Sequence, residues 1–211
     1  MALIRRCLAC STVLYLGVAV ASDKVPTSEQ LHRLLVPLQT FSARFEQAAS
    51  DDSGFAQEHS YGIFQFSRPA SMRWVVERPF KQQIVTDGRQ LWIYDEELDQ
   101  VIVEDFDGQL AVTPALILSG SLSEIETAFS VTEADGGDSK RNFTLVAKSH
   151  SELLDEITLT FSEHQLVAIS VKSQDQINTI TFSDVQVNKS IRDPSFSLKI
   201  PEGVDMIYNS Q

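Results

Sequence analysis

The hydrophobic pattern changes its period near residue 40, and beyond that point it mostly has the alternation of β-strands. Phe41, Ala43 and Phe45 alternate with polar neighbours, and similar segments recur as far as residues 196–200. Turn signals such as Asp87-Gly88 separate these segments. The pattern predicts about eleven antiparallel strands joined by short connections, the last of them at residues 196–200.

Two or three short helices interrupt the alternation. Leucines at positions 31, 34, 35 and 38 share one helical face, and Pro37 is expected to end that helix. A second helical segment is expected at residues 113–118, where Pro114 stands at a helix-opening position. A third is expected to open at Ser121 and to run through Phe129.

This inventory of elements predicts the fold class. A sheet of about eleven strands curls, and its concave side must be covered. Three short helices are too few to cover both faces. We therefore expect a mainly β protein, an incomplete and half-open antiparallel β-barrel with an α-helical lid over an apolar cavity.

The N-terminus has the pattern of a secretory signal peptide. Arg5 and Arg6 precede a mostly apolar stretch at residues 7–20, and Ala19-Val20-Ala21 fits a cleavage site. We expect a cleaved signal peptide at residues 1–21 and one domain at residues 22–211. A weak lipobox around Cys10 is disfavoured, because few apolar residues precede it. Cleavage would remove both cysteines, which excludes disulfides and thiolate metal sites from the exported chain.

Charge and motif content exclude several function classes. The formal net charge is −12, so binding of nucleic acid through a basic face is not expected. The sequence lacks the common nucleophile, phosphate-binding, dinucleotide-binding and zinc motifs. The four histidines are far apart in the sequence and fit surface positions. We expect no enzyme, no cofactor and no metal.

Arg68 is the most informative polar residue. It has the same parity as Gly62, Phe64 and Phe66, and Pro69 favours an extended backbone before it. If Arg68 points inward, carbonyl groups at helix C-termini are suitable partners, and the arginine would hold the lid to the sheet. The alternative is that the strand ends at Ser67 and that Arg68 is exposed.

The alternation also gives a set of apolar side chains that face inward. Whether they fill a core or line a cavity stays open, because both need the same residue types. Likewise, the inward face of residues 91–94 is undetermined, because both faces are apolar. The candidate lining residues are Leu35, Phe45, Phe64, Phe66, Met72, Trp74, Val76, Ile84, Leu116, Ile117 and Leu118.

Several segments together resemble one known family. Phe41-Ser42-Ala43-Arg44-Phe45-Glu46-Gln47 is similar to the first-strand motif of the LolA family of outer-membrane lipoprotein carriers. The resemblance continues, in the expected order, through residues 62–69, 72–74, 84–88, 91–95, 113–118 and 196–205. Each segment is a weak signal alone, whereas the ordered set is specific.

The resemblance implies a function and partners. It implies a monomeric periplasmic carrier of triacylated lipoproteins, loaded by an inner-membrane ABC transporter complex and unloaded at an outer-membrane receptor. It assigns the lid latch to Arg68 and the acyl-chain cavity to the inward residues given above. Met72 and Ala115 depart from residues found in some members, which bears on cargo preference.

Three alternatives remain at this stage. The first is an exported carrier of another lipid or a glycolipid with the same fold. The second is a lipid-sensing regulator of envelope stress, although 190 residues leave little room for the second domain that such regulators usually need. The third, a lipid hydrolase, lacks a plausible nucleophile and base.

Overall fold

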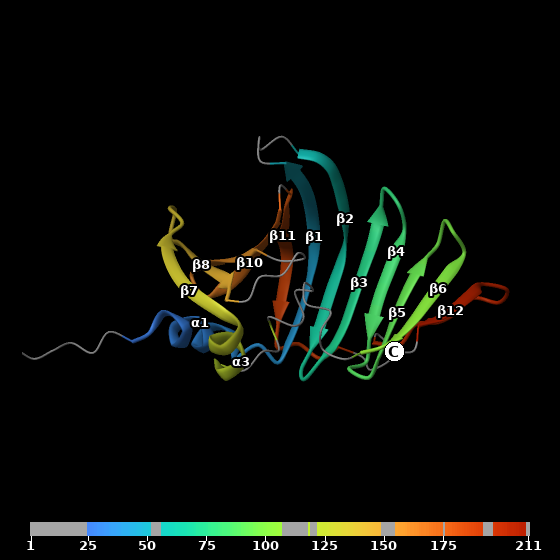
Figure 1. The fold of residues 1–211 in the computed structure, drawn as a ribbon, viewed down its shortest axis with the longest axis horizontal. Helices are drawn as coiled ribbons and strands as arrows, with labels where there is room; N and C mark the ends of the chain where they lie inside the picture. Colours follow the sequence, from blue (N-terminus) through green and yellow to red (C-terminus); the bar gives the residue numbers. More distant parts are fainter. Residues whose placement is uncertain are drawn as a thin grey trace, which may run out of the picture.

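The computed structural model describes residues 25–51, 56–106, 118, 122–148, 155–174, 176–191 and 196–209. In this part of the chain the strands form one 12-stranded sheet, in the order β12-β6-β5-β4-β3-β2-β1-β11-β10-β9-β8-β7 (Figure 1). The strands are β1 (Thr40–Asp51), β2 (Ala56–Ser67), β3 (Ser71–Arg78), β4 (Gln82–Thr86), β5 (Gln90–Asp95), β6 (Gln100–Asp105), β7 (Phe129–Asp135), β8 (Lys140–Ala147), β9 (Glu156–Ser162), β10 (Gln165–Ser173), β11 (Gln176–Val187) and β12 (Asp205–Asn209).

The sheet consists of two meanders that meet at its centre. β1 pairs with β2 on one side and with β11 on the other, so a strand early in the chain joins one near its end. β7 and β12 form the two edges and are not paired with each other. The predicted half-open, mainly β architecture is confirmed, with twelve strands in place of about eleven.

Two helices are described, and both lie at one end of the sheet (Figure 1). α1 (Thr27–Leu35) packs against α3 (Leu122–Ala128) and against β7. α1 ends at Leu35, ahead of Pro37 as expected. The prediction that α3 runs through Phe129 is wrong, because Phe129 already pairs with Ala147 in the β7–β8 ladder. Among the described residues, no helix combines the length and hydropathy that a membrane crossing requires.

The main core lies between the helices and the concave side of the sheet. Leu31 and Leu35 of α1 are completely buried there, against aromatic side chains from three strands. The ring of Phe41 lies 5.8 Å from that of Phe64 and 5.2 Å from that of Phe182, between centroids. This aromatic cluster joins β1, β2 and β11, which are the strands at the centre of the sheet.

A smaller core lies on the convex side. Tyr94, Val101 and Val103 are buried there under partly buried apolar residues of the C-terminal segment, among them Leu198 and Met206. Trp92 packs with this cluster, so β5 turns Trp92 and Tyr94 outward. Leu91 and Ile93 therefore face the concave side, which answers the question that the sequence left open.

The prediction of a strand at residues 196–200 is wrong. Phe196 is buried, but this segment covers the sheet through side-chain packing and does not add a backbone ladder. Such one-sided packing also produces an alternating pattern. The last strand is instead β12, which pairs with β6 in parallel, so the prediction of an antiparallel sheet is wrong for this one pair at the edge.

Gly62 allows a close contact at the centre of the concave face. A Cβ atom at this position would lie 1.8 Å from the carbonyl oxygen of Val75 and 2.8 Å from the ring of Phe45. The Phe45 ring stacks on Trp74 at 3.9 Å between centroids. The missing side chain therefore leaves the space that the Phe45 ring occupies over the strand.

We expect Gly62→Ala to lower the free energy of unfolding by about 1–3 kcal/mol, because the methyl group must displace the ring or the backbone. Thermal unfolding followed by circular dichroism measures the effect, and Ser60→Ala, on the same strand and face, is the control. An unfolding midpoint equal to that of the wild type would show that the strand absorbs the methyl group without strain.

Candidate functional site: a lidded cavity on the concave face

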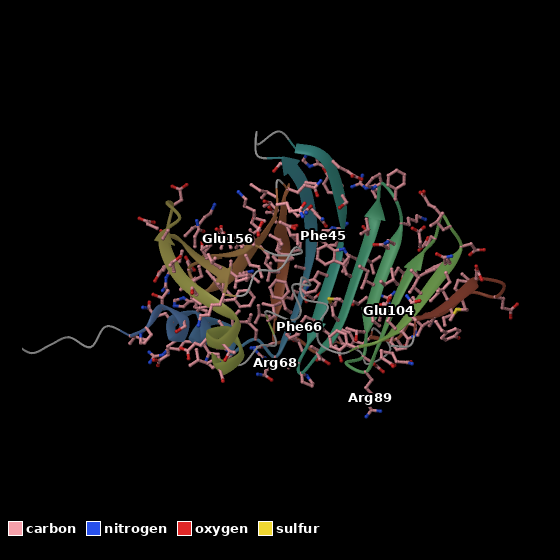
Figure 2. All side chains as sticks on the ribbon, viewed as in Figure 1. Phe45, Phe66, Arg68, Arg89, Glu104 and Glu156 are labelled. Carbon is pink, nitrogen blue, oxygen red and sulfur yellow. The ribbon has the colours of Figure 1, made fainter. Side chains whose placement is uncertain are left out.

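Arg68 links the end of β2 to the helical lid. Although β2 ends at Ser67, the Arg68 side chain points toward the lid, near Phe66 (Figure 2). Its Nε donates to the carbonyl oxygen of Leu38 at 2.8 Å, and one terminal nitrogen donates to those of Leu35 at 3.2 Å and Leu118 at 2.6 Å. One guanidinium thus joins the sheet to two separate lid segments.

The local structure explains why these carbonyl groups accept the arginine. Leu35 is the last residue of α1, and the last carbonyl groups of a helix lack partners within it. Asn188 fixes the chain that follows, since its side chain donates to the Pro37 carbonyl at 2.8 Å and accepts from the Gln39 amide at 2.8 Å. The residues on both sides of Leu38 are thereby held in place, and the Leu38 amide itself donates to the Leu35 carbonyl at 3.0 Å.

Arg68 is half-buried, and this shapes its electrostatics. Burial lowers the pKa of its guanidinium, because desolvation disfavours the charged form. A guanidinium nevertheless stays protonated in proteins, so the carbonyl oxygens receive hydrogen bonds from a full positive charge. Such charge-assisted bonds are stronger than neutral ones and strongly directional.

Beyond the lid, the concave face is hollow. A cavity of about 590 Å³ opens there between strands of both meanders. Its lining residues are Gln47, Ala49, Glu58, Ser60, Met72, Trp74, Val76, Gln82, Ile84, Val171, Gln176, Asn178 and Ile180. The cavity is thus built by the two arms of the sheet around β1, and both arms are needed to form it.

The inner face changes from apolar to polar along the strands. Near the lid, Phe41 and Phe66 face each other across the β1–β2 ladder, and farther along Phe45 faces Gly62. The next inward pairs are Gln47 with Ser60 and Ala49 with Glu58. In Figure 2, Phe45 lies farther from the helices than Phe66 and Arg68. The cavity therefore has an apolar inner part and a polar mouth.

The structure divides the predicted lining residues into two groups. Met72, Trp74, Val76 and Ile84 line the cavity. Leu35, Phe45, Phe64, Phe66 and Leu118 are buried in the packed core beneath the lid. Leu116 and Ile117 lie outside the described residues, as does residue 115. The concave face thus holds a filled core near the helices and a hollow farther away.

Sequence reasoning missed the polar residues at the mouth of the cavity and the lining residues on β10 and β11. Gln47, Ser60 and Gln82 have the same parity as apolar residues that were selected, so extending the alternation to polar positions would have found them. Val171 and Ile180 stand on β10 and β11, which are distant in sequence from β3 and β4. Their place opposite Trp74 depends on long-range pairing of β1 with β11, which no local signal reveals.

The described residues contain no group of three or more His, Asp or Glu side chains placed to hold a metal ion. Ion pairs such as Arg44–Glu77 and Arg141–Glu133 lie at the surface or are half-buried. Arg73 lies on the convex face, where its guanidinium donates to the Gln83 side chain at 2.7 Å. Within the described part of the chain, the cavity with its lid and Arg68 is the site that the fold assembles.

Comparison with known proteins places this geometry in a family. The family model described as outer membrane lipoprotein carrier protein LolA matches residues 37–199, a span that begins just before β1 and ends after β11. The chain belongs to the LolA family. LolA-family carriers are not enzymes.

Curated relatives support the same assignment over nearly the whole chain. The outer-membrane lipoprotein carrier protein of Chromohalobacter salexigens is 36% identical over 181 residues, which covers 85% of this chain and 86% of that protein. The outer-membrane lipoprotein carrier protein of Pseudomonas paraeruginosa is 33% identical over 196 residues, 92% and 94% of the two chains. The LolA resemblance stated from the sequence motifs is thereby confirmed.

A solved structure supports the fold independently. An uncharacterized conserved protein from Thermus thermophilus superimposes with a TM-score of 0.55 and covers 86% of this chain and 98% of its own. The two sequences are 9% identical, so this match concerns the LolA-like sheet alone.

Proposed function

We propose that the protein is a periplasmic carrier of outer-membrane lipoproteins that shields their acyl chains in the concave cavity. Family membership supports the type of function, because relatives at 33–36% identity are named outer-membrane lipoprotein carrier proteins. The observation that carries the mechanism is the cavity itself, which has apolar walls at Trp74 and Ile84 and a polar mouth. This polarity suits a molecule with hydrocarbon chains and a polar peptide.

The proposal includes the route of the cargo. A signal peptide at residues 1–21 is cleaved on export, which shifts the formal charge from −12 to −14 because Arg5 and Arg6 are lost. The carrier then accepts triacylated lipoproteins from an inner-membrane ABC transporter complex and passes them to an outer-membrane receptor. The acidic surface favours docking on basic partner surfaces.

The need for a carrier follows from the hydrophobic effect. Three chains of ~15 methylenes, at ~0.8 kcal/mol for each methylene, would cost ~36 kcal/mol if they were fully exposed to water. A carrier must cover this apolar surface and must still release it without a nucleotide. An empty state held closed by Arg68 provides the balance, because cargo has to break those hydrogen bonds on entry and regains nothing from them while bound.

A release assay tests the proposal. Purified mature protein is added to spheroplasts, and the supernatant is analysed for outer-membrane lipoproteins bound to the protein. We expect release that saturates at one lipoprotein for each carrier. Release that does not depend on added protein contradicts the proposal. Lipid without lipoprotein in the recovered complex, identified by mass spectrometry, would favour a carrier of another lipid.

A further inference from the structure

A row of isoleucines leads from the cavity to one edge of the sheet. Ile84, Ile93 and Ile102 stand directly opposite one another on β4, β5 and β6, and Ile207 on β12 stands beside Ile102. Directly opposed residues of neighbouring strands lie on the same face. Since Ile84 lines the cavity, this isoleucine row lies on the concave face and begins at Trp74, the partner of Ile84 on β3.

The isoleucine row is partly accessible, whereas the opposite face of the same strands is covered. Ile93 and Ile102 are half-buried, and Ile207 is 38% exposed. Val101 and Val103, on the convex face of β6, are 0% and 6% exposed beneath the C-terminal segment. Neither core cluster of the described residues includes Ile93 or Ile102. Among the described residues, this inner apolar surface is therefore not part of a packed core.

Polar positions border the isoleucine row and make it narrow. On the mouth side, the adjacent row consists of Gln82, Asp95, Gln100 and Asp205, which face one another across the same ladders. On the other side, buried Leu91 is followed by Glu104 and Asn209 toward the edge. Alternate residues on one strand lie ~7 Å apart, so the isoleucine row has the width of one side chain.

The isoleucine row, measured from Trp74 to Ile207, has the length of one extended acyl chain. From β3 to β12 there are four strand spacings of ~4.8 Å, which gives ~19 Å between Trp74 and Ile207. A chain of ~15 methylenes with C–C bonds of ~1.5 Å in a zigzag advances ~1.3 Å for each methylene, also ~19 Å. An extended acyl chain can therefore contact every residue of the row.

The isoleucine row continues the cavity wall toward the edge of the sheet. Ile84 lines the cavity and stands opposite Ile93, which in turn stands opposite Ile102. An acyl chain that covers Ile84 can therefore extend over both. We propose that one acyl chain of a triacylated cargo extends from the cavity along the isoleucine row to β12, an inference that rests on the proposed carrier function.

Photo-crosslinking tests the proposal. A photoreactive phenylalanine analogue replaces Ile207 in the mature full-length protein, and the matched control carries it at Tyr208. These neighbours on β12 are both exposed, but Tyr208 stands beside Val103 and so lies on the convex face. The probe is a synthetic peptide with a tripalmitoylated N-terminal S-glyceryl-cysteine. Loading is measured separately by co-elution.

We expect the triacylated peptide to crosslink at position 207 at least tenfold more than at position 208. Loaded triacylated peptide without a crosslink at 207, or with equal crosslinking at both positions, overturns the proposal. So does a crosslink from 207 to residues of the carrier itself in the loaded state. A peptide that does not load at all overturns the carrier function, and this inference with it.

A substitution gives a second readout that does not depend on crosslinking chemistry. Ile207→Glu is expected to weaken binding of the triacylated peptide about tenfold, because a carboxylate cannot lie against hydrocarbon. Tyr208→Glu serves as the control for added charge. Equal affinities of Ile207→Glu and wild type for the triacylated peptide overturn the proposal.

Discussion

Arg68→Leu is expected to load with lipoprotein as well as the wild type does, but to deliver it at least tenfold more slowly. The leucine side chain cannot donate to the carbonyl groups of Leu35, Leu38 and Leu118, so the closed empty state loses three charge-assisted hydrogen bonds. Hydrogen bonds to charged groups contribute about 1.5–3 kcal/mol each. Because cargo competes with the closed state, weakening that state makes the cargo bind more tightly and leave more slowly.

The measurement is transfer of a fluorescent lipopeptide from loaded carrier to receptor, at matched loading. Arg73→Leu is the control, because Arg73 is also half-buried but donates to Gln83 on the convex face, away from the lid. Arg68→Lys is expected to be intermediate, since an ammonium group lacks the planar fork that reaches several carbonyl groups at once. Equal delivery rates for Arg68→Leu and wild type would refute the latch.

Ile84→Glu is expected to weaken binding of an acyl-chain probe about a hundredfold, because the carboxylate enters an apolar wall that hydrocarbon must cover. Ile84 also lies between the cavity and Ile93, so the substitution affects both apolar surfaces. Displacement of a fluorescent fatty acid from the purified protein measures the affinity.

The matched control is Val75→Glu, which makes the same change on the other face of the neighbouring strand. Val75 pairs with Gln83 and is half-buried. Circular dichroism verifies that both variants keep their strand content. If Ile84→Glu folds and binds the probe as well as Val75→Glu does, the chains do not lie on the wall formed by β3 and β4.

The position of Arg68 could be predicted from the sequence because a strand's alternation is a local property. Phe64, Phe66 and Arg68 share a parity, and the chain stays extended far enough for the arginine to follow its neighbours inward. Its acceptors were predicted as a class, helix C-termini, since every helix leaves carbonyl groups without partners. Which carbonyl groups accept depends on how α1 and Leu118 dock, and that is a tertiary property.

The last strand could not be predicted for the opposite reason. β12 pairs in parallel with β6, from which it is separated by about half of the chain, and no turn signal connects them. The segment around Phe196 has a stronger apolar alternation than β12 has, yet it packs on the sheet through its side chains and joins no ladder. The division of the inward residues into core and cavity was likewise beyond local reasoning, since it depends on how far the helices extend over the sheet.

The unpaired edges β7 and β12 have a mechanical consequence. In a closed barrel, strand number and stagger fix the diameter, so widening the interior requires breaking hydrogen bonds. Here the first and last strands of the sheet are not joined, so the circumference is not fixed. The two arms around β1 can therefore change their curvature, and so admit cargo of different bulk, while every ladder in the sheet stays intact.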